Sequence, residues 1–533
     1  MEEEKKDAPF DPLDMNNYKI EKLPKMRKSG MEKWMATIGA PLAIVVFVLI
    51  YWVVDIPFLN TISVEGLDET ATTRLSILGY DAFIKINYAM LAIFAASIVL
   101  WITEAIPNYL TSLLVIFGIV VLGVTTEKTA FAQLGHPVMW LNILSFILAS
   151  MLVKTQVAKR FALWFMVRFG KSAGWIIFSF IVINLVLSAF ISATTAKAAI
   201  LLPIFMVIAA IYGAQGGKRN NFGKNLVLQN LFQINVGASG FLTGAGSNLL
   251  AAALMAGALG GRIFSYQDWF VAGFPLAIIL ILIAWFVGSK LIFPLKEEEK
   301  VPQIEGGMQR LKDELQKMGR MDYQEYKAIA IFVAVLILWA TDKQHGISQT
   351  TVAFAGAIVA LLPKIGIVNW NEVDIPWHLM LFSAGAYALG VGLDATGLPG
   401  TMVDTSFTSL GITEATPFWV IYLILTFLML FSALIFQSKT MRTLIFIPIA
   451  LGIETQFGFP VLSLAFPVAL LNNHVYVLPF NSKPAALLYT TDQYSWSDTF
   501  KFGITMMVIS WIMIIVWGET VFRWLGYTNG LFF

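Results

Sequence analysis

Residues 174–213 read GWIIFSFIVINLVLSAFISATTAKAAILLPIFMVIAAIYG, an apolar stretch with a polar turn, Ser192–Lys197, at its centre. A helix needs roughly 20 apolar residues to cross the hydrocarbon core of a bilayer, so this stretch is about two crossings long. A second long apolar stretch, 415–457, has its own polar turn, Gln437–Arg442. The sequence therefore predicts two helical hairpins, each with a polar turn between apolar arms.

The scarcity of charge places most of the chain in a membrane. Of the 533 residues, 13% are charged and 57% are hydrophobic, whereas soluble domains carry about 25% charged residues. The charged residues gather in segments 1–33 and 296–327. What remains cannot cover a water-soluble surface, which predicts an all-α polytopic membrane protein and excludes soluble enzymes and nucleic-acid binding. Cysteine is absent and the four histidines are scattered, so we expect no metal ion or other cofactor.

Eleven further apolar stretches predict eleven crossings in addition to the two hairpins. They lie at 34–54, 88–107, 109–126, 138–153, 226–260, 268–293, 326–341, 350–368, 377–394, 459–495 and 501–526. With a cytoplasmic N-terminus, 26 Lys and Arg residues face the cytoplasm and six face outward, as the positive-inside rule requires. This count places the C-terminus outside. It leaves four basic residues at membrane depth: Lys197, Lys439, Arg442 and Lys483.

The two halves of the chain resemble each other. Three pairs of segments recur in the same order: 100–104 (LWITE) with 338–342 (LWATD), 200–204 with 445–449, and 244–248 with 481–485. Each half holds five crossings and one hairpin, and an odd number of crossings inverts the second copy, as in many secondary transporters. The predicted division is a cytoplasmic segment 1–33, a first transmembrane helix with an extracellular loop 34–87, repeats 88–294 and 326–528, and a cytoplasmic linker 295–325.

Two of the predicted crossings, 226–260 and 459–495, contain helix-breaking residues. Gly237–Asn248 packs four glycines into a hydrophobic segment, and Leu478–Pro484 contains two prolines, which interrupt helical hydrogen bonding. Unwound backbone at membrane depth is tolerated only where protein or a water-filled cavity satisfies it. The half-helix after each break directs free N–H groups at the gap, which favours an anion.

Each of the four basic residues would cost about 2.5–3.5 kcal/mol at the centre of a lone helix. They must therefore face a polar cavity, pair with an acid, or extend to the lipid headgroups. The hydroxyls of Thr194, Thr195, Ser438 and Thr440 at the hairpin turns have two possible roles, since they can bind a carboxylate or cap the following helix. His378 and His474 are expected to be structural.

With these features, the chain resembles the divalent anion/sodium symporter family. The resemblance rests on Leu100–Pro107 (LWITEAIP), on the paired hairpin turns that are each followed by Pro-Ile, and on the two interrupted helices. It extends over about residues 88–526. It implies a homodimer that carries dicarboxylates, citrate or sulfate, with hairpins that turn back at the midplane. It also implies a transport part that moves against a scaffold as an elevator.

In that family each hairpin tip reads Ser-Asn-Thr, and the tips and unwound loops bind substrate and two sodium ions. By position, the resemblance implies substrate-binding residues Thr194, Thr195, Gly244, Ala245, Ser247, Asn248, Ser438, Lys439, Thr440, Asn481, Ser482 and Lys483, with Lys197 and Arg442 adding positive charge. Both tip asparagines are missing, because Thr194 and Lys439 stand in their places. The second loop also departs from the family's usual Thr-Pro-Pro-Asn. An ammonium group at Lys439 would lie near where a sodium ion otherwise binds.

Two functional hypotheses follow. The first is sodium-independent exchange of small dicarboxylates, such as succinate, malate, fumarate or 2-oxoglutarate, across the cell membrane. The second is sodium- or proton-coupled symport of dicarboxylate, citrate or sulfate, in which sodium would be a possible bound ion. An enzymatic role is not expected, because Ser438 and Lys439 share one turn, whereas a hydrolytic dyad needs nucleophile and base to face each other. A channel would not need two interrupted, inverted repeats.

Overall fold

The computed structural model describes residues 12–15, 30–60, 62, 67, 69–170, 172–214, 218–260, 264–304, 306–373, 375–396, 398, 416–434, 438–479 and 481–532. Every regular element in these ranges is a helix, as the sequence predicts for an all-α membrane protein. Most of the predicted cytoplasmic segment 1–33, together with Gln437 of the second polar turn, lies outside the described residues.

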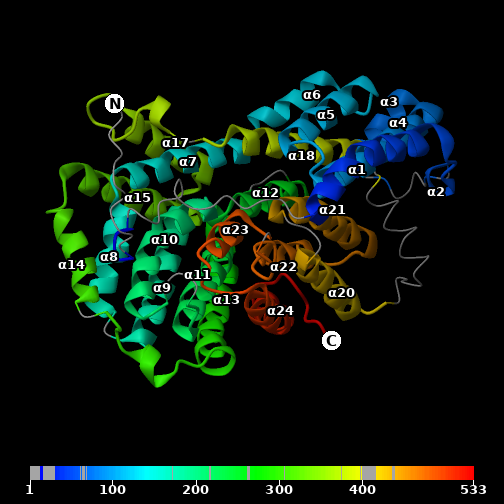
Figure 1. Cartoon of the computed structure of the whole chain (residues 1–533). Helices are drawn as coiled ribbons and strands as arrows, with labels where there is room; N and C mark the ends of the chain where they lie inside the picture. The colour runs from blue at the N-terminus through cyan, green and yellow to red at the C-terminus, as the bar shows by residue number, and fades with distance from the viewer. Residues whose placement is uncertain are drawn as a thin grey trace, which may run out of the picture.

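The helices form two packed groups (Figure 1). The first group, here called the frame, consists of α4 (Tyr80–Thr103), α5 (Asn108–Val121), α7 (Pro137–Lys154), α15 (Tyr323–Ala340), α17 (Gln349–Leu361) and α18 (Trp377–Thr396). Within it, α5 packs on α4 and α18, and α17 packs on α7 and α15. In Figure 1, α5, α7, α17 and α18 run across the top of the view.

The second group, here called the hairpin bundle, contains both hairpins and both interrupted helices. Its members are α9 (Ala173–Phe190), α10 (Thr194–Ile211), α11 (Asn221–Ser239), α12 (Gly246–Met255), α13 (Tyr266–Phe286), α20 (Phe418–Phe431), α21 (Lys439–Phe457), α22 (Ala465–Leu470), α23 (Lys483–Tyr489) and α24 (Trp496–Glu519). Helix α12 packs against α21 of the bundle and also against α7 and α18 of the frame. Each half of the sequence thus contributes three helices to the frame and five to the bundle.

Shorter or peripheral elements complete the chain. They are α1 (Gly30–Val48) with η3 (Leu49–Val53), α2 (Pro57–Asn60), α3 (Glu69–Leu78), α6 (Glu127–Ala132), η5 (Gln133–Gly135), α8 (Val157–Phe169), η6 (Leu242–Gly244), η7 (Gly257–Leu259), η8 (Val287–Ile292), η9 (Glu297–Lys300), α14 (Gly307–Lys317), α16 (Asp342–His345), η10 (Trp370–Glu372), η11 (Ser432–Leu434) and α25 (Val521–Trp524). Helix α1 packs on α4. Their contact is close, because a Cβ on Gly39 would lie 2.0 Å from the hydroxyl of Thr103.

The predicted apolar stretches all contain helices, but the number of crossings stays a prediction. Eight helical segments in the described residues are long and apolar enough to cross a membrane, and these include both arms of the first hairpin. The apolar helices α5, α12 and α17 and the α20–η11 segment are shorter. The chain is a multi-pass membrane protein, and the structure leaves open the predicted total of eleven crossings plus two hairpins.

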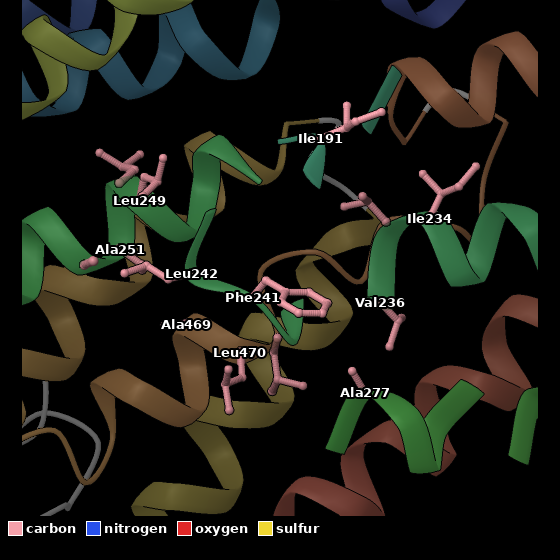
Figure 2. Close-up of a cluster of buried hydrophobic side chains, with 14 of the residues drawn as sticks. Ile191, Ile234, Val236, Phe241, Leu242, Leu249, Ala251, Ala277, Ala469 and Leu470 are labelled. Carbon is pink, nitrogen blue, oxygen red and sulfur yellow. The ribbon is translucent and has the colours of Figure 1, made fainter. Parts of the chain in front are cut away.

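The first helix break shows why its glycines are required. Gly244 lies so close to the end of α11 that a Cβ there would stand 2.3 Å from the carbonyl oxygen of Ala238. A Cβ on Gly240 would stand 3.1 Å from the Cα of Phe274 in α13. Phe241 and Leu242, between these glycines, pack in a buried apolar cluster with Ala277 and Leu470 (Figure 2). The glycines let the chain turn back, and the apolar residues between them hold the turn in place.

The second break is longer than the sequence indicates. We expected the interruption at Leu478–Pro484, but the α-helix already ends at Leu470 and resumes only at Lys483. The two flanking helices have six and seven residues. The carboxylate of Glu454 accepts hydrogen bonds from the backbone N–H groups of Leu464 and Ala465 at the start of α22. This interaction supports a helix too short to be stable alone.

The two copies of the Leu-Trp-x-Thr-acid motif make the same contacts. Trp101 Nε1 donates to the carbonyl of Asn108 at 3.4 Å, and Trp339 Nε1 donates to that of Gln349 at 3.0 Å. Each tryptophan thereby ties the end of one frame helix to the start of the next. The threonine of each copy bonds the carbonyl four residues earlier. Equivalent bonds at equivalent positions support the internal repeat.

The linker predicted at 295–325 is docked rather than free. The backbone N–H groups of Gln303 and Ile304 donate to the carbonyl of Ile211 at the end of α10. Glu299 is buried and accepts from the backbone N–H of Asn221 at the start of α11, at 2.9 Å. Helix α14 packs against α8 and α10. The linker therefore fastens to the end of the bundle that holds the first hairpin.

We expect Trp339→Phe to lower the stability of the folded protein. The substitution keeps an aromatic ring but leaves the buried carbonyl of Gln349 without its donor, which costs about 1–3 kcal/mol. Trp175→Phe is the control, because Trp175 is 58% exposed. Thermal unfolding of the detergent-purified protein should show a lower midpoint for Trp339→Phe alone. Equal midpoints for the two variants would contradict the assigned role of the motif.

Candidate functional site

The two hairpin tips meet through Lys439. Its ammonium donates to Thr194 Oγ1 of the first tip at 3.3 Å and to Asn473 Oδ1 at 3.1 Å. Thr194 is the first residue of α10 and Lys439 is the first residue of α21. Asn473 belongs to the non-helical segment between α22 and α23. One lysine thus links the first hairpin, the second hairpin and the second unwound segment.

Asn473 extends this connection to the first helix break. Its Nδ2 donates to Asn248 Oδ1 at 2.7 Å and to Ser239 Oγ at 3.3 Å. The hydroxyl of Ser247 contacts Asn473 Oδ1 at 3.2 Å and Asn472 Oδ1 at 3.4 Å. The two unwound segments and the two tips therefore form one buried polar network, here called the central network.

Asn248 also holds the first break in shape. Its Nδ2 donates to the carbonyls of Ala238 and Phe241 at 2.9 and 2.8 Å, in addition to the backbone N–H groups that these carbonyls accept. Asn481 acts similarly in the second break, because its Nδ2 donates to the carbonyl of Ala433 in the second hairpin. Both predicted residues are completely or almost completely buried. Their carboxamides bind backbone, which gives them a structural role in the site.

Arg442 has a different role from the charge pairing we considered. Its guanidinium is fully buried, and it bonds to the hydroxyl of Ser432 and to the backbone carbonyls of Met429, Leu430, Asn472 and His474. These five bonds equal the number of N–H donors on a guanidinium. Arg442 therefore satisfies the end of α20 and the second unwound segment, and it is fully engaged with the protein.

Lys197 occupies the repeat-related position in the first hairpin. It is fully buried, and its ammonium donates to Ser188 Oγ of α9 at 3.0 Å. The pair resembles the bond from Arg442 to Ser432, so in each hairpin a basic residue near the start of the second arm bonds a serine near the end of the first. Unlike Arg442, Lys197 has no bond to backbone carbonyls among the described residues.

No carboxylate neutralises these cations in the described residues. The ion pairs that the described residues do form involve other basic residues, as in Arg160–Glu325 and Lys224–Asp498. Within the same ranges no group of His, Asp and Glu residues could hold a metal ion. Lys197 and Arg442 are buried and Lys439 is half-buried, and the partners of all three are neutral oxygens. They make the centre of the bundle electropositive, and an anion is the natural ligand for such a region.

Four helices start at the two hairpin tips and the two breaks, and the capping of these starts differs between the halves. Ser438 caps α21 and Ser482 caps α23, each through its hydroxyl oxygen. Ala193 and Ala245 stand at the corresponding positions before α10 and α12 and supply no side-chain cap. The predicted serines of the second half are thus engaged as caps. The first half leaves the N–H groups of its two helix starts available to a ligand.

Two of the predicted residues, together with Gly246, are placed to meet a ligand without a side-chain bond to a described residue. Thr195 and Thr440 occupy repeat-related positions in the two tips, and both are half-buried without a hydrogen bond to a described residue. Gly246, at the start of α12, is exposed within a stretch that is otherwise buried. Gly244 and Ala245 beside it are buried backbone of the break.

Lys483 is the first residue of α23 and its side chain is exposed. The sequence predicts that it lies at membrane depth and needs a partner, and this placement stays a prediction. No bond to the central network involves Lys483 in the part of the chain that the structure describes, so its predicted contact with substrate stays a prediction.

The sequence analysis missed Asn473 and Ser239 altogether. Asn473 joins three segments of the central network, yet the residues that it bonds are far from it in the chain. The available signal was the Asn472-Asn473-His474 run inside an apolar segment, since polar residues at membrane depth mark functional sites.

Comparison with known proteins places this geometry in a family of transporters. Residues 81–528 match the family model described as the sodium:sulfate symporter transmembrane region. A membrane protein of Cupriavidus necator is 26% identical over 464 residues, which cover 82% of this chain and 88% of that protein. The sodium-dependent dicarboxylate transporter SdcS of Staphylococcus saprophyticus is 27% identical, covering 78% and 82%. SdcS of Staphylococcus aureus is 26% identical with the same coverage.

Among solved structures, the YdaH transporter of Alcanivorax borkumensis aligns with a TM-score of 0.44 at 12% identity, over 75% of this chain and 87% of that one.

Arg442→Met should strongly destabilise the protein, whereas Lys197→Met should not. The first change leaves the carbonyls of Asn472 and His474 without a donor among the described residues, at about 1–3 kcal/mol each, because those of Met429 and Leu430 also accept from Ser432. The second removes a buried charge that has one hydrogen bond. Arg442→Lys, with three donors, should be intermediate. Yield and thermal unfolding of the purified variants measure this, with Arg523→Met as the control because Arg523 is 50% exposed. Equal loss for Lys197→Met and Arg442→Met would refute the distinction.

Proposed function

The chain belongs to the sodium:sulfate symporter family of membrane transporters, and from that premise we propose that it exchanges small dicarboxylates across the cell membrane without sodium. The proposed substrates are dianions such as succinate, malate, fumarate and 2-oxoglutarate. The match to proteins named dicarboxylate transporters supports this substrate class. The chain is a transporter and has no enzymatic role.

The observation that carries the proposal is the position of Lys439. Its ammonium joins the two hairpin tips, where family members have an asparagine and bind sodium nearby. A sodium ion in such a site supplies positive charge that offsets the substrate. Site electrostatics must include that charge, and here a covalently fixed ammonium provides it.

The same charge favours exchange over net transport. An empty carrier would keep Lys439 and Lys197 buried without an anion, and moving uncompensated charge through the bilayer is costly. A carrier loaded with a dianion has its charge largely offset. Reorientation is therefore expected mainly when substrate is bound, and the loaded carrier returns only with another anion.

The proposed contacts with substrate are those that the protein leaves open. One carboxylate would accept hydrogen bonds from the free N–H groups at the starts of α10 and α12, where the helix dipoles also favour negative charge. The unpartnered hydroxyls of Thr195 and Thr440 stand at the two tips. The ammonium of Lys439 lies between the tips and attracts both carboxylates.

A sodium-coupled symporter is the second candidate. It is favoured by the names of the Staphylococcus relatives, which are sodium-dependent. In that case Thr194, Thr195 and the carbonyl oxygens around Gly244 would hold one ion. The substitution of lysine for the tip asparagine weighs against it, because a sodium ion beside Lys439 would experience repulsion.

The proposed movement is an elevator, in which the hairpin bundle slides along the frame of a homodimer. The separation of the helices into two packed groups supports it. We place the protein in the plasma or inner membrane with a cytoplasmic N-terminus and an external C-terminus, on the basis of the distribution of Lys and Arg. The hairpins would then turn back at the midplane.

Uptake of labelled succinate into proteoliposomes tests the proposal. We expect uptake when the vesicles contain unlabelled succinate, and little uptake when they are empty, in sodium-free buffer. An imposed sodium gradient should change neither rate. Uptake that requires the gradient and ignores internal succinate would establish the symporter instead.

Lys439→Asn restores the asparagine of the family tip and separates the two mechanisms. Because it removes the fixed ammonium, it should abolish exchange or make exchange depend on sodium. Lys364→Asn is the matched control, since Lys364 is an exposed loop residue with a left-handed backbone that asparagine tolerates. Unchanged, sodium-independent exchange in Lys439→Asn would count against the fixed-cation mechanism.

A further inference from the structure

A buried carboxamide on the frame faces the start of α12. Asn142 lies in the middle of α7 and is 2% exposed. Its Oδ1 atom is buried and makes no hydrogen bond with a described residue. An unpartnered polar atom in a buried position costs about 1–3 kcal/mol. A residue of this kind needs an explanation, such as a ligand that is present only part of the time.

The atom points at the one open position in the first interrupted helix. Gly246 is the only exposed residue in the fully described stretch 225–253. A Cβ built on Gly246 would lie 3.7 Å from Asn142 Oδ1, with no other neighbour within 4 Å. The space above Gly246 is therefore bordered by Asn142. Any larger residue at position 246 would occupy that space.

The start of α12 is chemically suited to an anion. The helix has ten residues, and Ala245 at its N-cap position supplies no side-chain acceptor. The N–H groups of Gly246 and Ser247 precede the first backbone bond of the helix, which Asn248 makes to Ala245. Free N–H groups and the helix dipole at this end attract a carboxylate, and Asn142 flanks them from the opposite side.

We propose that Asn142 is a further substrate-binding residue. Its carboxamide binds the substrate carboxylate that is held at the start of α12. This inference rests on the proposed dicarboxylate transport. A half-turn about the last side-chain bond exchanges Oδ1 for Nδ2 at the same place, so the carboxamide donates to a carboxylate when one is present. The substrate site is then shared between the hairpin bundle and the frame.

Sharing the site has a consequence for specificity. Asn142 can donate to a carboxylate or accept from a hydroxyl, so it can contact both the carboxylate and the 2-hydroxyl group of malate. Succinate offers only the carboxylate. Removing the carboxamide should therefore weaken malate binding more than succinate binding.

The test measures counterflow of succinate and malate in proteoliposomes containing Asn142→Ala. We expect KM to rise at least about tenfold with an unchanged maximal rate, because a hydrogen bond to a charged group is lost. Asn87→Ala is the matched control. Asn87 is also a buried asparagine with an unpartnered Oδ1, but it lies on α4, and its Nδ2 bonds within its own helix.

The outcomes are distinguishable. A structural role for Asn142 would lower the maximal rate and the melting temperature while KM stayed the same, and that result overturns the inference. If Asn142→Ala does not fold, Asn142→Ser retains a short donor and should show a smaller rise in KM, whereas an unchanged KM there overturns the inference too. Failure of the wild-type protein to exchange dicarboxylates would refute the proposed function. If the wild-type protein exchanges dicarboxylates and the folded Asn142 variants have the wild-type KM, only this inference is refuted.

Discussion

Backbone groups at the two helix breaks must find hydrogen-bond partners inside the protein, because the bilayer offers none. This requirement explains most of the side-chain hydrogen bonds in the centre of the bundle, because they satisfy backbone groups or join the two breaks. Asn248 closes the first break by binding two carbonyls. Arg442 binds the carbonyls of Asn472 and His474 in the second break and also Ser432, Met429 and Leu430 at the end of the first arm of its hairpin. Asn473 then joins the two breaks to each other and to Lys439.

The means of satisfying that backbone differ between the halves, and the difference creates the functional asymmetry. The second half uses a guanidinium for its unwound carbonyls and serine caps for its helix starts. The first half uses a neutral carboxamide and leaves its helix starts uncapped. Free N–H groups therefore lie at the helix starts of the first half, whereas two of the three cations, Lys439 and Arg442, belong to the second half and Lys197 belongs to the first. An anion placed between them would meet donors from both halves.

Much of this arrangement could be predicted from the sequence. The apolar lengths of 174–213 and 415–457 predicted the hairpins, and glycine and proline predicted the two breaks, since these signals are local. The partner of Arg442 could not be predicted, because backbone carbonyls carry no sequence signal. Asn473 was missed for a related reason, as its bonds reach Ser239 and Asn248 across more than two hundred residues. The start of the second break was misplaced, because the α-helix already ends at Leu470, before the two prolines.

The central claim is that positive charge built into the protein completes an anion site without sodium. Isothermal titration calorimetry of the purified protein with succinate tests it most directly, in matched buffers that contain either sodium or choline. The account predicts the same dissociation constant in both buffers. Binding that appears only with sodium, or that tightens steeply as sodium is added, would contradict it.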